Sequence, residues 1–297
     1  MLPQLPLDKW EDTKNTLHLF MQIVGKIRLS LFPKTNHWWH VPLYVSCRGL
    51  STRPIPYIER WFEIQFDFID HQLHVLCSDG RQESFSLEGQ SVADFYQSLF
   101  DALKKIEVQV SITAKPYDVP FSNIPFAKDT THASYDPQWV TKYWQALGFV
   151  NSTFEIFRAR FIGKSTPVHL FWHHADLALT RFSGKKAPTL EGRSKADQEA
   201  YSHEAISFGY WVGDDTVREP AFYAYVYPEP ENMTDEPLTP TEATWFTDYG
   251  YAMAFLPYEA VRKAKHPTEY LLDFLENAYQ LCARRADWDV ESLTLVP

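Results

Sequence analysis

Titratable side chains are concentrated in one stretch of the chain, residues 167–230. It opens with P-V-H-L-F-W-H-H-A-D-L-A-L-T-R-F-S-G, continues through Y-S-H-E and closes on A-F-Y-A-Y-V-Y-P-E-P. Ordinary core strands do not carry so many imidazole, carboxylate and guanidinium groups, because burying them unpaired is unfavourable. If the protein has a chemical site, we expect it here, and its polar candidates are His169, Asp176, Arg181, His203, Glu204 and Glu229.

Strand alternation decides which of these groups can meet, because successive side chains point to opposite faces. With residues 168–180 fully extended, His169 and Asp176 lie on opposite faces. His203 and Glu204 are neighbours, so they also point to opposite faces of their strand. The third strand places three tyrosines and a carboxylate on one face, an unusual surface for simple core packing: Tyr223, Tyr225, Tyr227 and Glu229.

Two kinds of chemistry fit this mixture of imidazole and carboxylate groups. The first is a divalent metal site, since both groups are ligands of zinc and related metals. The second is metal-free acid–base catalysis, with a histidine tuned by a nearby carboxylate. No H-E-x-x-H or other fixed ligand spacing chooses between them. The catalytic candidates are the same for both: His169, Asp176, His203, Glu204 and Glu229.

A purely structural role is the alternative for each of these residues, because ion pairs and hydrogen bonds also hold strands in register. Binding of a small molecule would add aromatic walls to the polar groups. Aromatic residues make up 16% of the chain, which is enough to fill a core and to line a pocket. The candidates for ligand binding are Trp172, Arg181, Trp211, Tyr223, Tyr225 and Tyr227.

Several reaction classes lack their sequence signatures. No G-x-S-x-G segment surrounds a serine, and neither G-x-G-x-x-G nor a Walker motif is present among the 11 glycines. We therefore expect no nucleotide cofactor, while metal binding stays open.

Composition indicates the class of protein and its partners. The chain has 297 residues, 45% of them hydrophobic and 22% charged, which is typical of a folded globular protein. A net charge of −10 argues against nucleic acid and anionic membranes as partners, and no apolar run is long enough to span a membrane. The three cysteines lie far apart and no signal peptide is evident, so we expect a soluble cytoplasmic protein. The oligomeric state is not indicated.

Two helices are expected in the first part of the chain. Asp8 and Glu11 form a capping-box pattern ahead of apolar residues at helical spacing, which continue to about Ser30. Ser91 and Asp94 begin the second helix in the same way. Between and after them, alternating residues predict strands at 61–69, 71–78, 81–87 and 108–113, with a type I′ turn at Asp79-Gly80.

The second part of the chain repeats this order. Asp136-Pro137 starts a long helix, and Pro267 starts a closing helix. Strands are expected within 167–230 and at 252–256, separated by polar loops at 185–200 and 231–249. We divide the chain into an N-terminal α+β half (1–115), an ordered connection (116–135) and a C-terminal α+β half with the candidate site (136–297).

An internal duplication would explain the repeated order of elements. A constant offset of about 134 residues pairs Trp10 with Trp144 and Trp38 with Trp172. The predicted fold class is therefore α+β, with antiparallel sheets, long packed helices and two related halves.

Long motifs along nearly the whole chain resemble an uncharacterised bacterial family of about this length. They include N-H-W-W-H-V-P-L-Y-V-S-C-R-G-L, F-D-F-I-D-H-Q-L, F-I-G-K-S-T-P-V-H-L-F-W and F-Y-A-Y-V-Y-P-E-P. The resemblance is to a domain of unknown function, so it implies one intact unit and supplies no catalytic residue to carry over.

The leading functional hypothesis is a soluble small-molecule-binding protein, which as an enzyme would use a His/carboxylate acid–base or metal site. The alternative is a non-catalytic protein whose aromatic surface docks a partner or a second copy. A ligand site predicts that the polar candidates cluster, whereas scattering over opposite faces would argue against it.

Overall fold

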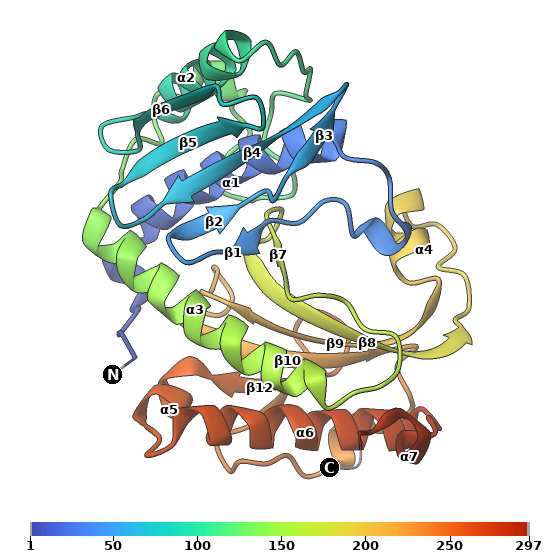
Figure 1. Cartoon of the computed structure of the whole chain (residues 1–297). Helices are drawn as coiled ribbons and strands as arrows, with labels where there is room; N and C mark the ends of the chain where they lie inside the picture. The colour runs from blue at the N-terminus through green and yellow to red at the C-terminus, as the bar shows by residue number, and fades with distance from the viewer. Residues whose placement is uncertain (1, 296–297) are drawn as a thin grey trace.

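The computed structural model describes residues 2–295. They form seven α-helices and twelve strands, and the strands make two antiparallel sheets of six, so the fold is α+β as predicted (Figure 1). The first sheet has the order β1-β2-β4-β5-β6, with β3 paired to β4: β1 Tyr44–Val45, β2 Gly49–Ser51, β3 Ile55–Tyr57, β4 Arg60–Asp67, β5 Gln72–Cys77 and β6 Gln82–Ser86. The second has the order β11-β12-β10-β9-β8-β7: β7 His169–Phe171, β8 Asp176–Lys186, β9 His203–Trp211, β10 Ala221–Tyr227, β11 Thr244–Phe246 and β12 Met253–Pro257.

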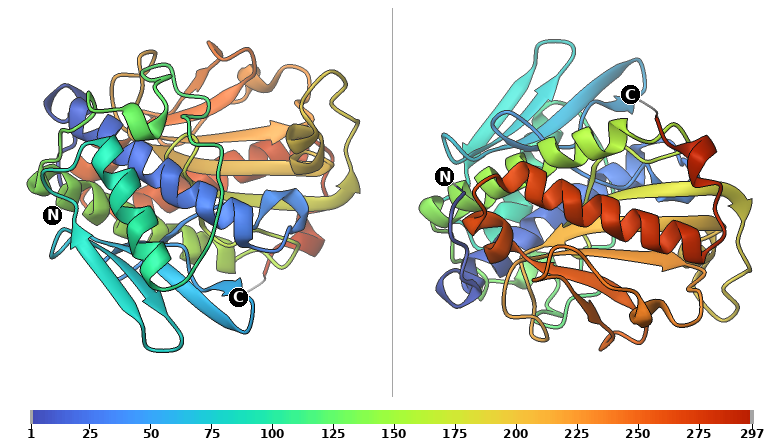
Figure 2. Two further views of the ribbon diagram at one scale, coloured as in Figure 1. Left: turned by 90° about the horizontal axis from the view of Figure 1, so that it is seen from above. Right: turned by 90° about the horizontal axis from the view of Figure 1, so that it is seen from below.

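The helices lie between and outside the sheets (Figure 1). The long helix α1 (Glu11–Leu31) runs through the middle of the molecule, and fourteen of its residues are buried. Helix α6 (Pro267–Arg285) lies across the outer face of the second sheet, with α5 (Tyr258–Lys263) before it (Figure 2, right). The remaining helices are α2 Val92–Lys105, α3 Pro137–Ala159, α4 Lys195–Ala200 and α7 Val290–Leu293.

Two of the three predicted side-chain caps are present. The Ser91 side chain accepts a hydrogen bond from the Asp94 backbone, and Asp136 accepts from the first turn of α3. The capping box at Asp8 was wrong, because α1 begins at Glu11 after a 3-10 turn that buries Leu7. Glu11 instead pairs with Arg218 from the second part of the chain.

Some of the predicted strands and loops were also wrong. Residues 108–113 join neither sheet, although their apolar side chains pack on the core. The expected loops at 185–200 and 231–249 contain α4 and β11 respectively. The Asp79-Gly80 hairpin is present, but only Gly80 has a positive φ, so its turn is not of type I′.

The two parts of the chain meet along α1 and β7. Leu43 and Leu170 exchange two backbone hydrogen bonds of 2.9 Å, which links the edges of the sheets. Trp172 packs against Gly25 of α1, where an added Cβ would lie 2.1 Å from the indole ring. One hydrophobic cluster includes residues from both parts. The order of helix, antiparallel strands and helix recurs, but an internal duplication is not shown by it.

Candidate functional site

The two faces of the second sheet differ in what covers them. Strand pairing places Leu177, Arg181 and Phe208 on the face covered by α3 and α6, which we call the helix-covered face. The other face is the open face, formed by Asp176, Ala178, Thr180, Ser207, Gly209, Tyr223 and Tyr225. Seen from above, the gold and orange strands of this sheet extend beyond α1 (Figure 2, left). Asp176, Thr180, Tyr223 and Tyr225 are partly exposed there.

A hydrogen bond between strands β8 and β10 is central to the open face. The Tyr223 hydroxyl donates to Asp176 Oδ2 over 2.6 Å, although β9 lies between their strands. The Tyr223 ring crosses β9 above Gly209, where an added Cβ would lie 2.0 Å from the ring. Glycine at 209 is therefore required for this contact.

Hydroxyl groups continue the network from Tyr225. Tyr201 and Tyr225 share a hydrogen bond of 2.8 Å, and Ser207 and Thr180 share one of 3.0 Å. The Tyr223 and Tyr225 rings stack with centroids 6.0 Å apart, and Tyr251 packs edge-on to Tyr225 at 5.4 Å. Tyrosine rings and hydroxyls from β8, β9, β10 and two neighbouring loops thus lie together, with the Asp176 carboxylate on β8 beside them.

The surrounding protein disfavours charge on these groups. Burial raises the pKa of the Asp176 carboxyl, although nearby His174 and the Tyr223 hydrogen bond both lower it. Burial also raises the pKa of Tyr223 and Tyr225 well above the usual value. Both hydroxyls therefore stay protonated and can donate at neutral pH.

His169 lies on the same face as Asp176, contrary to the prediction from continuous alternation. Residues 172–175 form a turn instead of continuing the strand, and β7 pairs back on β8. Phe171 is then opposite Asp176, and His169 is its diagonal neighbour at ~7–8 Å between Cα atoms. His169 is 1% exposed and packs edge-on to Tyr44, with ring centroids 5.6 Å apart.

The other acid–base candidates do not join Asp176. Asp176 lies near the Trp211 end of β9, since its neighbour Leu177 pairs with Tyr210. His203 is at the other end of β9, eight residues and so ~26 Å along the strand from Trp211. Glu204 points to the helix-covered face and accepts from the Ser183 hydroxyl at 2.7 Å. Glu229 lies beyond the end of β10, where it accepts a backbone hydrogen bond from Ala252. The six predicted polar candidates therefore lie on both faces of the sheet and do not form one cluster, which argues against a single site built from all six.

The ligand-binding candidates also divide between locations. Arg181 is on the helix-covered face, with its guanidinium 3.6 Å from the Phe157 ring centroid. Trp172 lies in the turn after β7, and its indole donates to the Val41 carbonyl. Trp211 is beside Tyr223 on the open face, with ring centroids 5.6 Å apart.

Tyr227 lies at the edge of this face. Its hydroxyl donates to the Pro188 carbonyl over 2.9 Å. Its ring packs edge-on to the Tyr201 ring, with centroids 5.1 Å apart. Tyr227 therefore joins the loop after β8 to the tyrosines of the network.

Metal ligands do not cluster in residues 2–295. No group of three or more His, Cys, Asp or Glu side chains there is placed to hold a metal ion. The arrangement at Asp176 is one carboxylate with hydroxyl and aromatic neighbours, which suits hydrogen bonding more than metal coordination.

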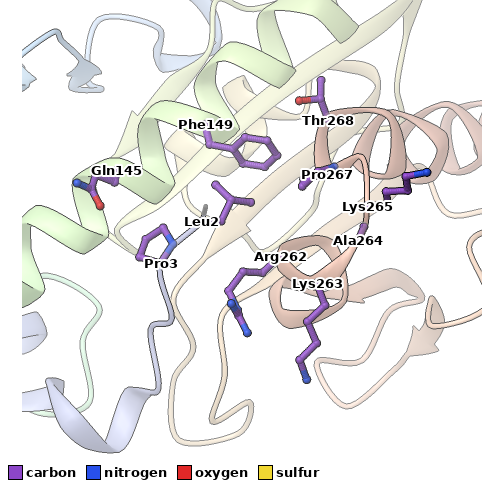
Figure 3. Close-up of a pocket in the computed structure, with 10 residues that line it drawn as sticks. All are labelled: Leu2, Pro3, Gln145, Phe149, Arg262, Lys263, Ala264, Lys265, Pro267 and Thr268. Atoms are coloured by element: carbon purple, nitrogen blue, oxygen red, sulfur yellow. The ribbon is translucent and has the colours of Figure 1, made fainter.

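One hollow in the described part of the chain lies away from the open face. It measures about 790 Å³ and opens between the N-terminal residues, α3 and the start of α6 (Figure 3). Its polar groups include Arg262 and Lys263, which both pair with Glu259. None of the predicted site residues lines it, and no carboxylate faces it. The residues that line it are Leu2, Pro3, Gln145, Phe149, Arg262, Lys263, Ala264, Lys265, Pro267 and Thr268. We therefore place the candidate site on the open face.

Sequence reasoning missed several members of this site. Thr180, Tyr201, Ser207 and Tyr251 carry hydroxyls that the predicted strands did not mark as functional. A signal was available at Gly209, because a glycine inside an aromatic strand indicates close approach by another group.

The chain matches a family model over residues 2–295, described as a family of unknown function (DUF5996). The protein belongs to this family. The match covers both sheets and all seven helices of the described residues, so the open face lies within the matched region. No curated protein and no solved structure matches the chain. In the part described, no helix is long and apolar enough to cross a membrane.

Proposed function

We propose that the open face binds a small organic molecule through hydrogen bonds to Asp176 and the tyrosine hydroxyls and through contact with aromatic rings. The hydrogen bond from Tyr223 to Asp176 is the observation that carries this proposal. It requires glycine at 209, and it joins two partly exposed side chains where a packed core would place apolar ones. Aromatic walls with a few convergent polar groups are typical of ligand sites.

The groups left free indicate how a ligand would be held. Asp176 Oδ2 accepts from Tyr223, which leaves Oδ1 as an acceptor for a donor on the ligand. The Tyr201 and Tyr225 hydroxyls share one hydrogen bond, which uses one of their two hydrogens and leaves the other for a ligand acceptor. The stacked rings of Tyr223 and Tyr225 offer a surface for an apolar or cationic part of the ligand.

An acid–base role for Asp176 is the enzymatic form of the proposal. Its raised pKa brings the carboxyl closer to neutral pH, where it can both give and take a proton. The cytoplasm is the location that we propose, because Cys47, Cys77 and Cys282 are free thiols, as expected in a reducing compartment.

Ligand-observed NMR with a fragment library of polyols, amines and aromatic acids tests the proposal. Fragments should bind the unmodified protein and lose binding in Tyr223→Phe and Asp176→Asn. Tyr57→Phe is the matched control, because its hydroxyl accepts from the Gln109 backbone in the first part of the chain. Hits that no variant affects would contradict the proposal. A stable dimer that buries Trp211 would instead favour the docking alternative.

A further inference from the structure

A second group of polar side chains lies where the first sheet meets the second. It comprises Arg28 near the end of α1, Tyr44 of β1, Arg53 after β2 and His169 of β7. The Tyr44 ring is its centre. The Arg53 guanidinium lies 3.6 Å from the ring centroid and that of Arg28 lies 5.6 Å away, while the His169 ring is 5.6 Å from it.

Two members of this group are buried with unused hydrogen-bonding atoms. His169 is 1% exposed, and neither of its ring nitrogens has a partner in the described structure. Arg28 is 2% exposed, and its Nε has no partner, while Nη1 donates to the Thr52 carbonyl over 2.6 Å. Buried polar groups are nearly always hydrogen-bonded in folded proteins, so both side chains require an explanation.

The group is also positively charged. In residues 2–295 neither Arg28 nor Arg53 forms an ion pair with an acidic side chain, and both guanidinium groups lie over the same ring, that of Tyr44, whose centroid is 5.6 Å from Arg28 and 3.6 Å from Arg53. Arg158 also acts on His169, but its own charge is paired with Glu155 over 3.3 Å. A single ordered water could satisfy one His169 nitrogen, but it would leave the arginines without a counter-charge.

We propose that Arg28, Arg53 and His169 bind a small oxyanion, the carboxylate or phosphate group of a metabolite. Guanidinium groups match both oxyanions by paired N–H donors, and a neutral imidazole adds one more donor. Arg53 is exposed to solvent, whereas Arg28 and His169 are buried around the same Tyr44 ring. His169 is a diagonal neighbour of Asp176, but the proposal does not depend on the proposed function there, since none of these contacts uses the tyrosine network.

Calorimetric titration with inorganic phosphate and with succinate tests the site, at an ionic strength held constant with sodium chloride. The variant Arg53→Gln removes an exposed guanidinium and should weaken binding about tenfold, the loss of one charge-assisted hydrogen bond. Arg284→Gln is the matched control, because Arg284 is an exposed arginine on α6, outside the helix-covered face. It should bind like the unmodified protein. Tighter binding of phosphate or of succinate identifies which oxyanion the site prefers.

His169→Phe provides a second variant that keeps the ring packing. It should fold, with an unchanged circular dichroism spectrum, and bind the preferred anion more weakly. The proposal is overturned if neither anion binds the unmodified protein, or if Arg53→Gln binds as tightly as the control. Unchanged affinity in folded His169→Phe would also overturn it, because His169 would then be a packed ring without a ligand.

Discussion

The two faces of the second sheet use the same strands for different purposes. On the helix-covered face, Leu179, Phe208 and Phe222 are fully buried against the helices. On the open face, Asp176, Tyr223 and Tyr225 remain partly exposed and hydrogen-bonded. The first arrangement follows from the hydrophobic effect alone. The second keeps hydrogen-bonded polar groups and aromatic rings partly exposed on a sheet face, which is why we assign binding to it.

Arg181 does not fit this division. Arg181 is 1% exposed on the helix-covered face, held by the Phe157 carbonyl at 2.5 Å and by the Phe157 and Tyr279 rings. Burial lowers the pKa of its guanidinium to about 10, because the charged form has lost most of its water. Its Nε has no partner in the part of the chain that the structure describes.

Replacing Arg181 should give the largest effect. Arg181→Ala leaves a cavity among four aromatic rings, and we expect the free energy of unfolding to fall by about 4 kcal/mol. Arg181→Met fills the same space without a charge, and it should lie within about 1 kcal/mol of the unmodified protein or above it. Urea unfolding at pH 7 measures both. Equal losses in the two variants would mean that the charge itself, and not the packing, stabilises this face.

Gly209→Val should break the open face. The new side chain would overlap the Tyr223 ring and force it away from Asp176, with a loss of about 3 kcal/mol. Gly148→Ala on α3 is the control, because an added Cβ there meets nothing within 4 Å and should raise stability by up to ~1 kcal/mol. Thermal unfolding followed by circular dichroism compares them. A Gly209→Val protein as stable as the original would show that the Tyr223 contact is not tightly packed.

The free energy of unfolding should decrease at acidic pH partly because of His169. Burial, reinforced by Arg53 and Arg28, lowers the pKa of folded His169 to about 3. The unfolded chain binds that proton near pH 6.5, so stability falls as the pH drops from about 6.5 towards 3. At pH 5 this one group should lower the free energy of unfolding by about 2 kcal/mol.

The variant His169→Phe isolates this contribution. His18 and His173, whose pKa values burial lowers to about 4 and about 3, respond to pH in the same way in both proteins. The loss between pH 7 and pH 5 should therefore be about 2 kcal/mol smaller in His169→Phe. Urea unfolding at the two pH values measures it. An identical loss in both proteins would place water or another partner on the His169 ring.

Local chemistry explains which elements could be predicted from the sequence. Ser91 and Asp136 start helices because their side chains accept backbone hydrogen bonds, whatever lies around them. The segment 108–113 has the alternation of a strand but no neighbouring strand to pair with. Alternation reports which side chains are buried, and it does not report whether a partner is available.

The site was harder to predict because it depends on contacts between distant strands. The sequence marks residues 167–230 as rich in functional groups and places Tyr223 and Tyr225 on one face. It does not indicate the turn that brings His169 to the face of Asp176. Nor does it pair Tyr223 with Asp176, because that contact depends on the register of three strands.

Two tyrosine hydroxyls on opposite faces give the smallest and most specific comparison. Tyr210 is fully buried on the helix-covered face, and its hydroxyl has no partner among residues 2–295, so Tyr210→Phe should raise the free energy of unfolding by up to ~1 kcal/mol. Tyr223→Phe removes the hydrogen bond to Asp176 and should lower it by about 1 kcal/mol. Urea unfolding measures both changes in the free energy of unfolding. Changes of opposite sign would show that the Tyr223 hydroxyl stabilises the fold and the Tyr210 hydroxyl does not. If both variants gained stability, the Tyr223–Asp176 hydrogen bond would destabilise the folded protein, and its presence would have to be explained by binding alone.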